Sequence, residues 1–212
     1  MPNVALGGHE KKSLIASERD DAARAAWRTQ EALTAARRYL FVDECGMQTN
    51  MTPRYARAPR GERAYGSVPR NHHKNTTIFA CLTAQGMGEC MAIEGAADGE
   101  AFVAYLRHFL VPTLIPGQVV VLDNLSVHKD ARVAPLLAAA GCRLCYLPAY
   151  SPDFNPIELA FSKIKTAMRQ VEARTHDAVV DALGPVLDTV TPADVVGWYH
   201  HAGYSLELEQ AP

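Results

Sequence analysis

Three acidic residues have the types and the order of a divalent-cation site. Asp43 and Asp123 close two apolar, β-branched runs that are typical of buried strands. Glu158 opens an apolar helical repeat. A buried carboxylate needs a paired charge or a metal ion. Three of them at one point predict chemistry on phosphodiesters, because two divalent cations roughly 4 Å apart activate a water and stabilise the leaving oxygen.

Each acid also has an ordinary structural interpretation, which the residues alone leave open. Asp43 fits a strand end that turns into solvent, and Asp123 fits an Asx turn or helix cap after its strand. Glu158 fits the third residue of a helix with Asn155 as N-cap and Pro156 at the first position. A glutamate at the third position hydrogen-bonds back to the cap.

Polar residues close to the acids are predicted to support them. Asn124 and His128 follow Asp123 and would orient a ligand or contact a phosphate, although holding the loop together explains them equally well. Asn155 is a further supporting residue. Glu44 is an alternative ligand to the aspartate before it, but neighbouring strand residues point to opposite faces, so only one of the two is expected in the site.

The charge of the chain is informative locally rather than overall. The 212 residues fit one domain that buries roughly 70% of its unfolded surface, and the net charge of −2 with a pI near 6.4 does not itself indicate a nucleic-acid binder. Basic residues gather in one polar segment and on the last long helix. We expect them to contact DNA phosphates, with a solvated basic loop as the alternative; they are Arg54, Arg57, Arg60, Arg63, Arg70, Lys74, Lys163 and Lys165.

The cysteines favour buried free thiols in a reducing cytosol. There are five, and four of them occur in apolar, strand-like runs. Cys142 and Cys145 have C-x-x-C spacing, but in a strand they face opposite ways, so a zinc or redox site is not expected. The chain has no apolar run of 18 residues and no signal peptide, which predicts a cytoplasmic protein without a membrane span.

The predicted elements alternate along the chain. Strands are expected at 39–45, 76–83, 89–94, 118–123 and 142–147, and helices at 18–38, 99–114, 131–140, 156–171, 176–190 and 192–201. Pro135 is awkward inside its helix, which should start late or kink there. Residues 46–75 form a long polar segment without apolar periodicity.

This order predicts an α/β fold. Three meandering strands followed by alternating strands and helices indicate a mixed five-stranded sheet with helices on both faces. Right-handed crossovers allow the strand that ends in Asp123 to lie parallel beside the strand of Asp43, and Glu158 then enters from the helix after the last strand. This is the ribonuclease-H-like arrangement.

Several ordered motifs resemble one known family. They are Phe41-Val-Asp-Glu-Cys-Gly46, Thr49-Asn-Met51, Ala58-Pro-Arg-Gly-Glu62, Val121-Leu-Asp-Asn124 with His128-Lys129, and Tyr146-Leu-Pro-Ala-Tyr-Ser-Pro-Asp-Phe-Asn-Pro-Ile-Glu158 followed by Phe161-Ser-Lys-Ile-Lys165. With 34 residues between Asp123 and Glu158, the chain resembles the DDE superfamily endonucleases, in particular the transposases of the bacterial IS-six-thirty insertion-sequence family, which are mariner-related. The resemblance runs from about Lys11 to Tyr204.

The resemblance implies a metal-dependent transposase catalytic domain. Asp43, Asp123 and Glu158 would be the catalytic residues and would bind Mg²⁺ or Mn²⁺, with two ions expected. The implied activity is DNA strand cleavage at insertion-sequence ends, followed by strand transfer into target DNA. The implied partners are end and target DNA and further copies of the chain, as a homodimer or higher assembly on DNA. The implied location is the bacterial cytoplasm, associated with the nucleoid.

The chain departs from the family mainly at its beginning. Relatives carry helix-turn-helix domains before the catalytic domain, so residues 1–38 are expected to be a linker and helix left from a missing N-terminal DNA-binding region. Residues 39–204 form the expected ribonuclease-H-like catalytic domain, and 205–212 a tail. Two other functions stay open: an inactive truncated remnant or regulator that binds DNA or a full-length transposase, and another ribonuclease-H-like nuclease or resolvase.

Overall fold

The computed structural model describes residues 15–31, 34–70 and 75–206, which form a five-stranded mixed sheet. The strands lie in the order β3-β2-β1-β4-β5. β1 is antiparallel to β2, β2 is antiparallel to β3, and β1, β4 and β5 run parallel. The predicted sheet, with the strand before Asp123 parallel beside that of Asp43, is therefore confirmed. The strands are β1 (Tyr39–Met47), β2 (Thr76–Thr83), β3 (Gly86–Glu94), β4 (Val119–Leu122) and β5 (Arg143–Tyr146).

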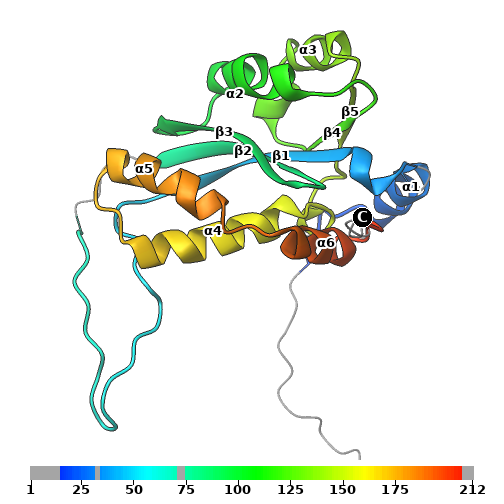
Figure 1. Ribbon diagram of the computed structural model, residues 1–212. Helices are drawn as coiled ribbons and strands as arrows, with labels where there is room; N and C mark the ends of the chain where they lie inside the picture. Colours follow the sequence, from blue (N-terminus) through cyan, green and yellow to red (C-terminus); the bar gives the residue numbers. More distant parts are fainter. Residues whose placement is uncertain (1–14, 32–33, 71–74, 207–212) are drawn as a thin grey trace, which may run out of the picture.

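Helices cover both faces of the sheet, as predicted (Figure 1). One face carries α2 (Gly99–Tyr105) and α3 (Val133–Ala139). The other face carries α4 (Ile157–Val171), α5 (His176–Leu187) and α6 (Pro192–His201). Helix α1 (Asp21–Glu31) lies beside the start of β1 rather than on either layer (Figure 1).

Alternate residues of β1 supply the two halves of the core. Phe41 and Cys45 belong to the cluster that packs under α4, α5 and α6, whereas Leu40 and Val42 belong to the cluster under α2 and α3. Side chains of a strand alternate between faces. Asp43 therefore shares the face of Phe41, and Glu44 points to the opposite one.

Several element boundaries differ from the sequence prediction. Strand β1 continues to Met47, so Asp43 lies inside it and is only 6% exposed; the interpretation of Asp43 as a strand end in solvent is wrong. Strand β3 begins earlier than predicted, at Gly86, and α1 ends at Glu31 instead of continuing to the start of β1.

Two helices depart from the prediction close to a proline. Helix α2 passes into a π-helix, Leu106–Leu110, and a 3-10 turn, Val111–Thr113, where Pro112 has no N–H to continue the α-helical pattern. Helix α3 starts late, as predicted, and Pro135 occupies its first turn, where a backbone N–H has no acceptor within the helix.

A long excursion separates β1 from β2 and is called the arm here, residues 52–70 (cyan in Figure 1). Every residue from Pro53 to Val68 is exposed. The contacts lie at its base, where Arg174 donates to the carbonyl oxygens of Thr49 and Met51 at 3.1 and 2.7 Å. The arm is thus fixed at its root and extends away from the sheet.

The described residues contain neither a disulfide nor a helix able to cross a membrane. All five cysteines are free, and all except Cys90 are buried. Cys142 and Cys145 join the core clusters on opposite sides of the sheet, so the prediction that they face apart is confirmed.

Candidate active site

The three predicted acids line one cavity of about 330 Å³ at the end of β4. Asp43 comes from inside β1, Asp123 directly follows β4, and Glu158 is the second residue of α4. Parallel β1 and β4 bring the first two together, and the loop after β5 delivers the third. The lining residues are Asp43, Asp123, Asn124, Leu125, Leu147, Pro148, Ala149, Tyr150, Ser151, Pro152, Asn155 and Glu158.

Asp43 is held by two donors inside the protein. Its Oδ2 accepts a hydrogen bond from Nδ2 of Asn155 at 2.9 Å, and its Oδ1 accepts one from the backbone N–H of Glu44 at 2.8 Å. The pKa of Asp43 is raised to about 8, chiefly by burial and in addition by the charges of Glu44, Asp123 and Glu158. An anionic Asp43 therefore requires a compensating positive charge.

Asn155 supports the site differently from the sequence prediction. The N-cap of α4 is Pro156, with no side-chain cap, so the capping interpretation of Asn155 and Glu158 is wrong. The side chain of Asn155 bonds to Asp43 instead, and its Oδ1 is buried with no hydrogen-bond partner among the described residues. An orphaned buried oxygen beside a buried carboxyl group fits a cation or the water bound to one.

Asp123 is positioned by its own loop and by His128. Its Oδ1 accepts a hydrogen bond from the N–H of Leu125 at 3.0 Å, so the Asx-turn interpretation is correct, although the same carboxylate also lines the cavity. Nδ1 of His128 lies 2.6 Å from Oδ1 of Asp123 as an ion pair rather than an aligned hydrogen bond. Burial opposes ionisation of Asp123, but His128 and the Leu125 N–H outweigh it and lower its pKa.

His128 contacts the carboxylates of both Asp123 and Glu44. It is fully buried in the 3-10 turn Ser126–Lys129, and its Nε2 lies 3.0 Å from Oε2 of Glu44. Burial alone would lower the pKa of His128, but the carboxylates of Asp123 and Glu44 outweigh it and raise the pKa to about 9. The sequence prediction that Glu44 turns away from the cavity is correct. Its partner is the histidine that holds Asp123.

The carboxylate and amide oxygens of the cavity suit a hard divalent cation, but they do not form a complete coordination shell. Carboxylate and amide oxygens are ligands that Mg²⁺ and Mn²⁺ prefer. Within residues 15–31, 34–70 and 75–206, no group of three or more His, Cys, Asp and Glu side chains is close enough to hold a metal ion. The acids thus share a cavity, with Glu158 exposed, but do not converge on one point.

The predicted DNA-contact residues fall into three groups. Arg54, Arg57, Arg60, Arg63 and Arg70 are all exposed on the arm. Lys163 forms an ion pair with Asp194 at 2.5 Å between α4 and α6, and Lys165 is half-buried on α4. Lys74 lies outside the described residues. Contact with DNA stays a prediction for all of them. The arginines of the arm are the most exposed of those that the structure describes.

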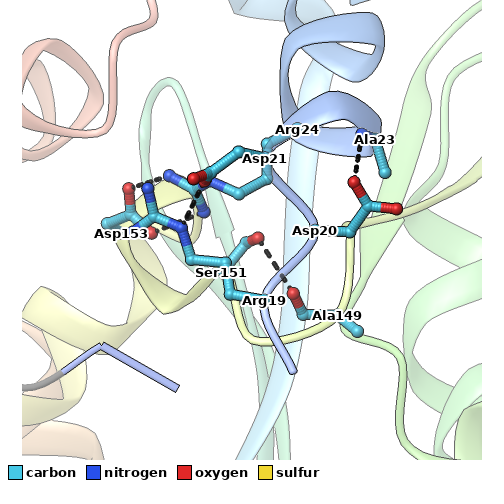
Figure 2. A network of polar contacts seen from close by, with 8 residues as sticks. All are labelled: Arg19, Asp20, Asp21, Ala23, Arg24, Ala149, Ser151 and Asp153. Atoms are coloured by element: carbon cyan, nitrogen blue, oxygen red, sulfur yellow. Dashed lines mark hydrogen bonds and ion pairs between the residues drawn. The ribbon is translucent and has the colours of Figure 1, made fainter. Parts of the chain in front are cut away.

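Sequence reasoning missed Arg24 of α1. Its guanidinium bonds to Asp153, 129 residues later (Figure 2). Asp153 lies in the same loop as Asn155. The only local signal was its place one turn before Trp27 in the predicted helix 18–38. A charged residue at such a position is usually solvated, so its partner was not foreseeable from the sequence.

The comparisons with known proteins agree with this geometry. The family model described as DDE superfamily endonuclease matches residues 38–180, which include all three acids. No curated protein matches the chain by sequence. The structure matches 136 chains of solved structures, and structures of Mos1 are among them.

Three of these structures illustrate the likeness. The Mos1 strand transfer complex is 15% identical with a TM-score of 0.70, covering 92% of this chain and 63% of that chain. The Mos1 transposase paired-end complex with the left transposon end is 14% identical with a TM-score of 0.69, covering 95% and 68%. The catalytic domain of Mos1 mariner transposase is 13% identical with a TM-score of 0.62, covering 93% and 92%. The predicted fold is confirmed, and the chain spans about 63% of the length of the first of these chains.

Proposed function

Because the chain belongs to the family of DDE superfamily endonucleases, we propose that it is the catalytic domain of a transposase that cleaves and transfers DNA strands at insertion-sequence ends. The observation that carries the proposal is that Asp43, Asp123 and Glu158 line one cavity within the matched region. The finer placement in the IS-six-thirty branch rests on the motifs around these acids, above all the stretch from Tyr146 to Glu158.

The proposed cofactor is Mg²⁺ or Mn²⁺, with two ions. When bound, such ions would supply an activated water and stabilise the leaving oxygen of a phosphodiester. Mos1 paired-end complexes have been solved with Mn and with Mg, which supports the same choice here. The residues that would hold the ions are Asp43, Asp123 and Glu158, with the free oxygen of Asn155 beside them.

The chain's own residues prepare the site in three ways. Asn155 and the Glu44 N–H fix both oxygens of Asp43. His128, charged at neutral pH because its pKa is raised to about 9, holds Asp123 from the buried side and keeps it ionised. Glu158, exposed on the first turn of α4, would be free to adjust towards a bound cation.

The proposed partners are DNA at the element ends and in the target, and further copies of this chain. The exposed arginines of the arm would contact DNA phosphates without reading sequence. The Mos1 strand transfer complex and the paired-end complex with the left transposon end support DNA as the substrate. We propose a homodimer or higher assembly on that DNA. The proposed location is the bacterial cytoplasm, at the nucleoid.

A calorimetric Mn²⁺ titration of the full chain with a short DNA duplex tests the metal site. Asp123→Asn keeps the shape of the side chain but removes its charge, so we expect saturable binding in the wild type and its loss in the variant. Asp181→Asn, an exposed acid on α5, is the matched control and should bind like the wild type. Equal binding by Asp123→Asn and the wild type would refute the assignment.

A further inference from the structure

We propose that Arg24 is a positioning residue of the active site: through Asp153 and Phe154, helix α1 fixes the turn that directs Asn155 to Asp43 and begins the helix of Glu158. This inference rests on the proposed function for the role of the acids. The turn, residues 151–155, is called the catalytic turn here. Nothing in the chemistry of the acids themselves requires α1, so the coupling is an additional property of this chain.

The pair between Arg24 and Asp153 is well placed to fix the turn. Arg24 is only 7% exposed, and a buried guanidinium needs a partner for its N–H groups. Nη1 and Nη2 donate to Oδ1 and Oδ2 of Asp153 at 2.9 and 2.6 Å, a bidentate geometry that sets orientation as well as distance (Figure 2). The carboxylate thereby acquires a fixed position, and its pKa is lowered, mainly by Arg24.

Phe154 is held by the same face of α1. Arg24, Trp27 and Arg28 are three and four residues apart, so their side chains lie on one side of the helix. The Trp27 ring stacks on Phe154 with centroids 5.5 Å apart. The guanidinium carbons of Arg24 and Arg28 lie 3.9 and 3.8 Å from the Phe154 ring centroid.

The backbone of the turn is fixed from a second side. The hydroxyl of Tyr204 donates to the carbonyl oxygen of Phe154 at 2.8 Å, and the Tyr204 ring packs edge-on to Trp27. Pro152 within the turn and Pro156 directly after it restrict the backbone, because proline fixes φ. The catalytic turn is therefore a stiff unit whose position depends on α1.

The stiff unit ends at the acids. Asn155 directly follows Phe154 and donates to Asp43 at 2.9 Å, and Glu158 lies three residues further on. Asp153 itself is half exposed and is not among the residues that line the cavity. Its contact with Arg24 thus has no evident use in the chemistry, but a displacement of the turn would move Asn155 and the start of α4 together.

The experiment compares two bidentate pairs that dock the same helix. Arg24→Met keeps the length and packing of the side chain on Phe154 and removes the guanidinium. Arg143→Met is the matched control, because Arg143 makes an equivalent pair with Glu31 at the opposite end of α1, at 2.9 and 2.6 Å. Asp153→Asn breaks the first pair from its exposed side, so it tests the same link if Arg24→Met does not fold.

Two readouts are made on the full chain. The first is backbone hydrogen exchange of residues 151–158 without metal, and the second is Mn²⁺ affinity with a short DNA duplex. We expect Arg24→Met and Asp153→Asn to raise the exchange rate and to weaken Mn²⁺ binding about ten-fold, as for other residues that orient metal ligands. Arg143→Met should lower the melting temperature while leaving both readouts within about two-fold.

The outcomes separate this inference from the proposed function. Unchanged exchange in the Arg24 and Asp153 variants, or an equal change in Arg143→Met, would overturn the positioning role. Faster exchange confined to the Arg24 and Asp153 variants would support it. A wild-type chain that takes up no Mn²⁺ would overturn the proposed metal site, while the exchange comparison would still decide whether α1 fixes the catalytic turn.

Discussion

The arm and the catalytic turn are both loops that combine polar residues with proline, and they have opposite environments. Both are polar segments punctuated by proline, with Pro53, Pro59 and Pro69 in the arm and Pro152 in the turn. The arm is exposed from residue 53 to 68 and is anchored at its root. The turn is bound by α1 on one side and Tyr204 on the other. Long-range partners, rather than composition, decide which loop is fixed.

Matched aromatic truncations give the largest expected difference between the two regions. Phe154 is 5% exposed and Tyr65 is 90% exposed. We expect Phe154→Ala to lower the free energy of unfolding by about 3–5 kcal/mol, because it empties a packed site. Tyr65→Ala should change it by less than about 0.5 kcal/mol. Urea unfolding of both variants measures the contrast, and equal losses would mean that the arm is packed in solution.

The next largest effect concerns the other anchor of α1. Arg143→Met leaves Glu31, 5% exposed, without its cation, and we expect a loss of about 2 kcal/mol at pH 7. The pKa of Glu31 is lowered from 4.5, chiefly by Arg143, so this stabilisation is complete above pH 4.5 and is lost as the pH falls through the lowered value. Unfolding curves of variant and wild type should converge in acid, and a pH-independent gap would contradict the ion-pair explanation.

Asn155→Ala sharpens the comparison at the end of the catalytic turn. It removes the donor to Asp43 and should weaken Mn²⁺ binding about ten-fold, equivalent to about 1.4 kcal/mol. Asn124→Ala, at an exposed residue of the same cavity, should have the smaller effect. Calorimetry on both variants checks the order, and a reversed order would place the main support of the site elsewhere.

Substitutions in the arm should have the smallest effect on stability, and they should change DNA affinity separately. The double substitution Arg57→Gln and Arg60→Gln should leave the free energy of unfolding within about 0.5 kcal/mol of wild type. If both arginines contact phosphates, the slope of log affinity against log salt should become shallower by about 0.9 for each lost contact, on every duplex tested. An unchanged slope would remove these arginines from the DNA interface.

The fold and the acids were predictable because their signals are local. Apolar, β-branched runs identified the strands around Asp43 and Asp123, and the alternation of strand residues correctly separated Asp43 from Glu44. The cap prediction for Asn155 failed because its side chain is turned towards Asp43, 112 residues earlier, to which its Nδ2 donates, so its Oδ1 does not accept from the first N–H groups of α4. Capping rules consider only hydrogen bonds between residues at one helix end, so they cannot predict a partner that is distant in sequence.

The positions of charged partners were not predictable for the same reason. Nothing in the sequence indicated that the ammonium of Lys163, whose contact with DNA stays a prediction, pairs with Asp194, the residue that also closes the capping box of α6. Arg24 finds Asp153 only after α1 docks beside the catalytic turn. Both pairs join segments that are distant in sequence, and a single sequence does not reveal which opposite charge each side chain meets.

Side chains of β1 alternate between the two faces of the sheet, and this limits which insertions and deletions the strand tolerates. Deletion of the single codon for Val42 would shift Asp43 into the place of Val42, which is completely buried under the helices of the opposite face. Glu44 would then occupy the vacated position beside Asn155, one methylene longer and no longer paired with His128. In-frame insertions and deletions should therefore accumulate in the arm and be purged from β1, and the arm is the natural place to insert a peptide tag.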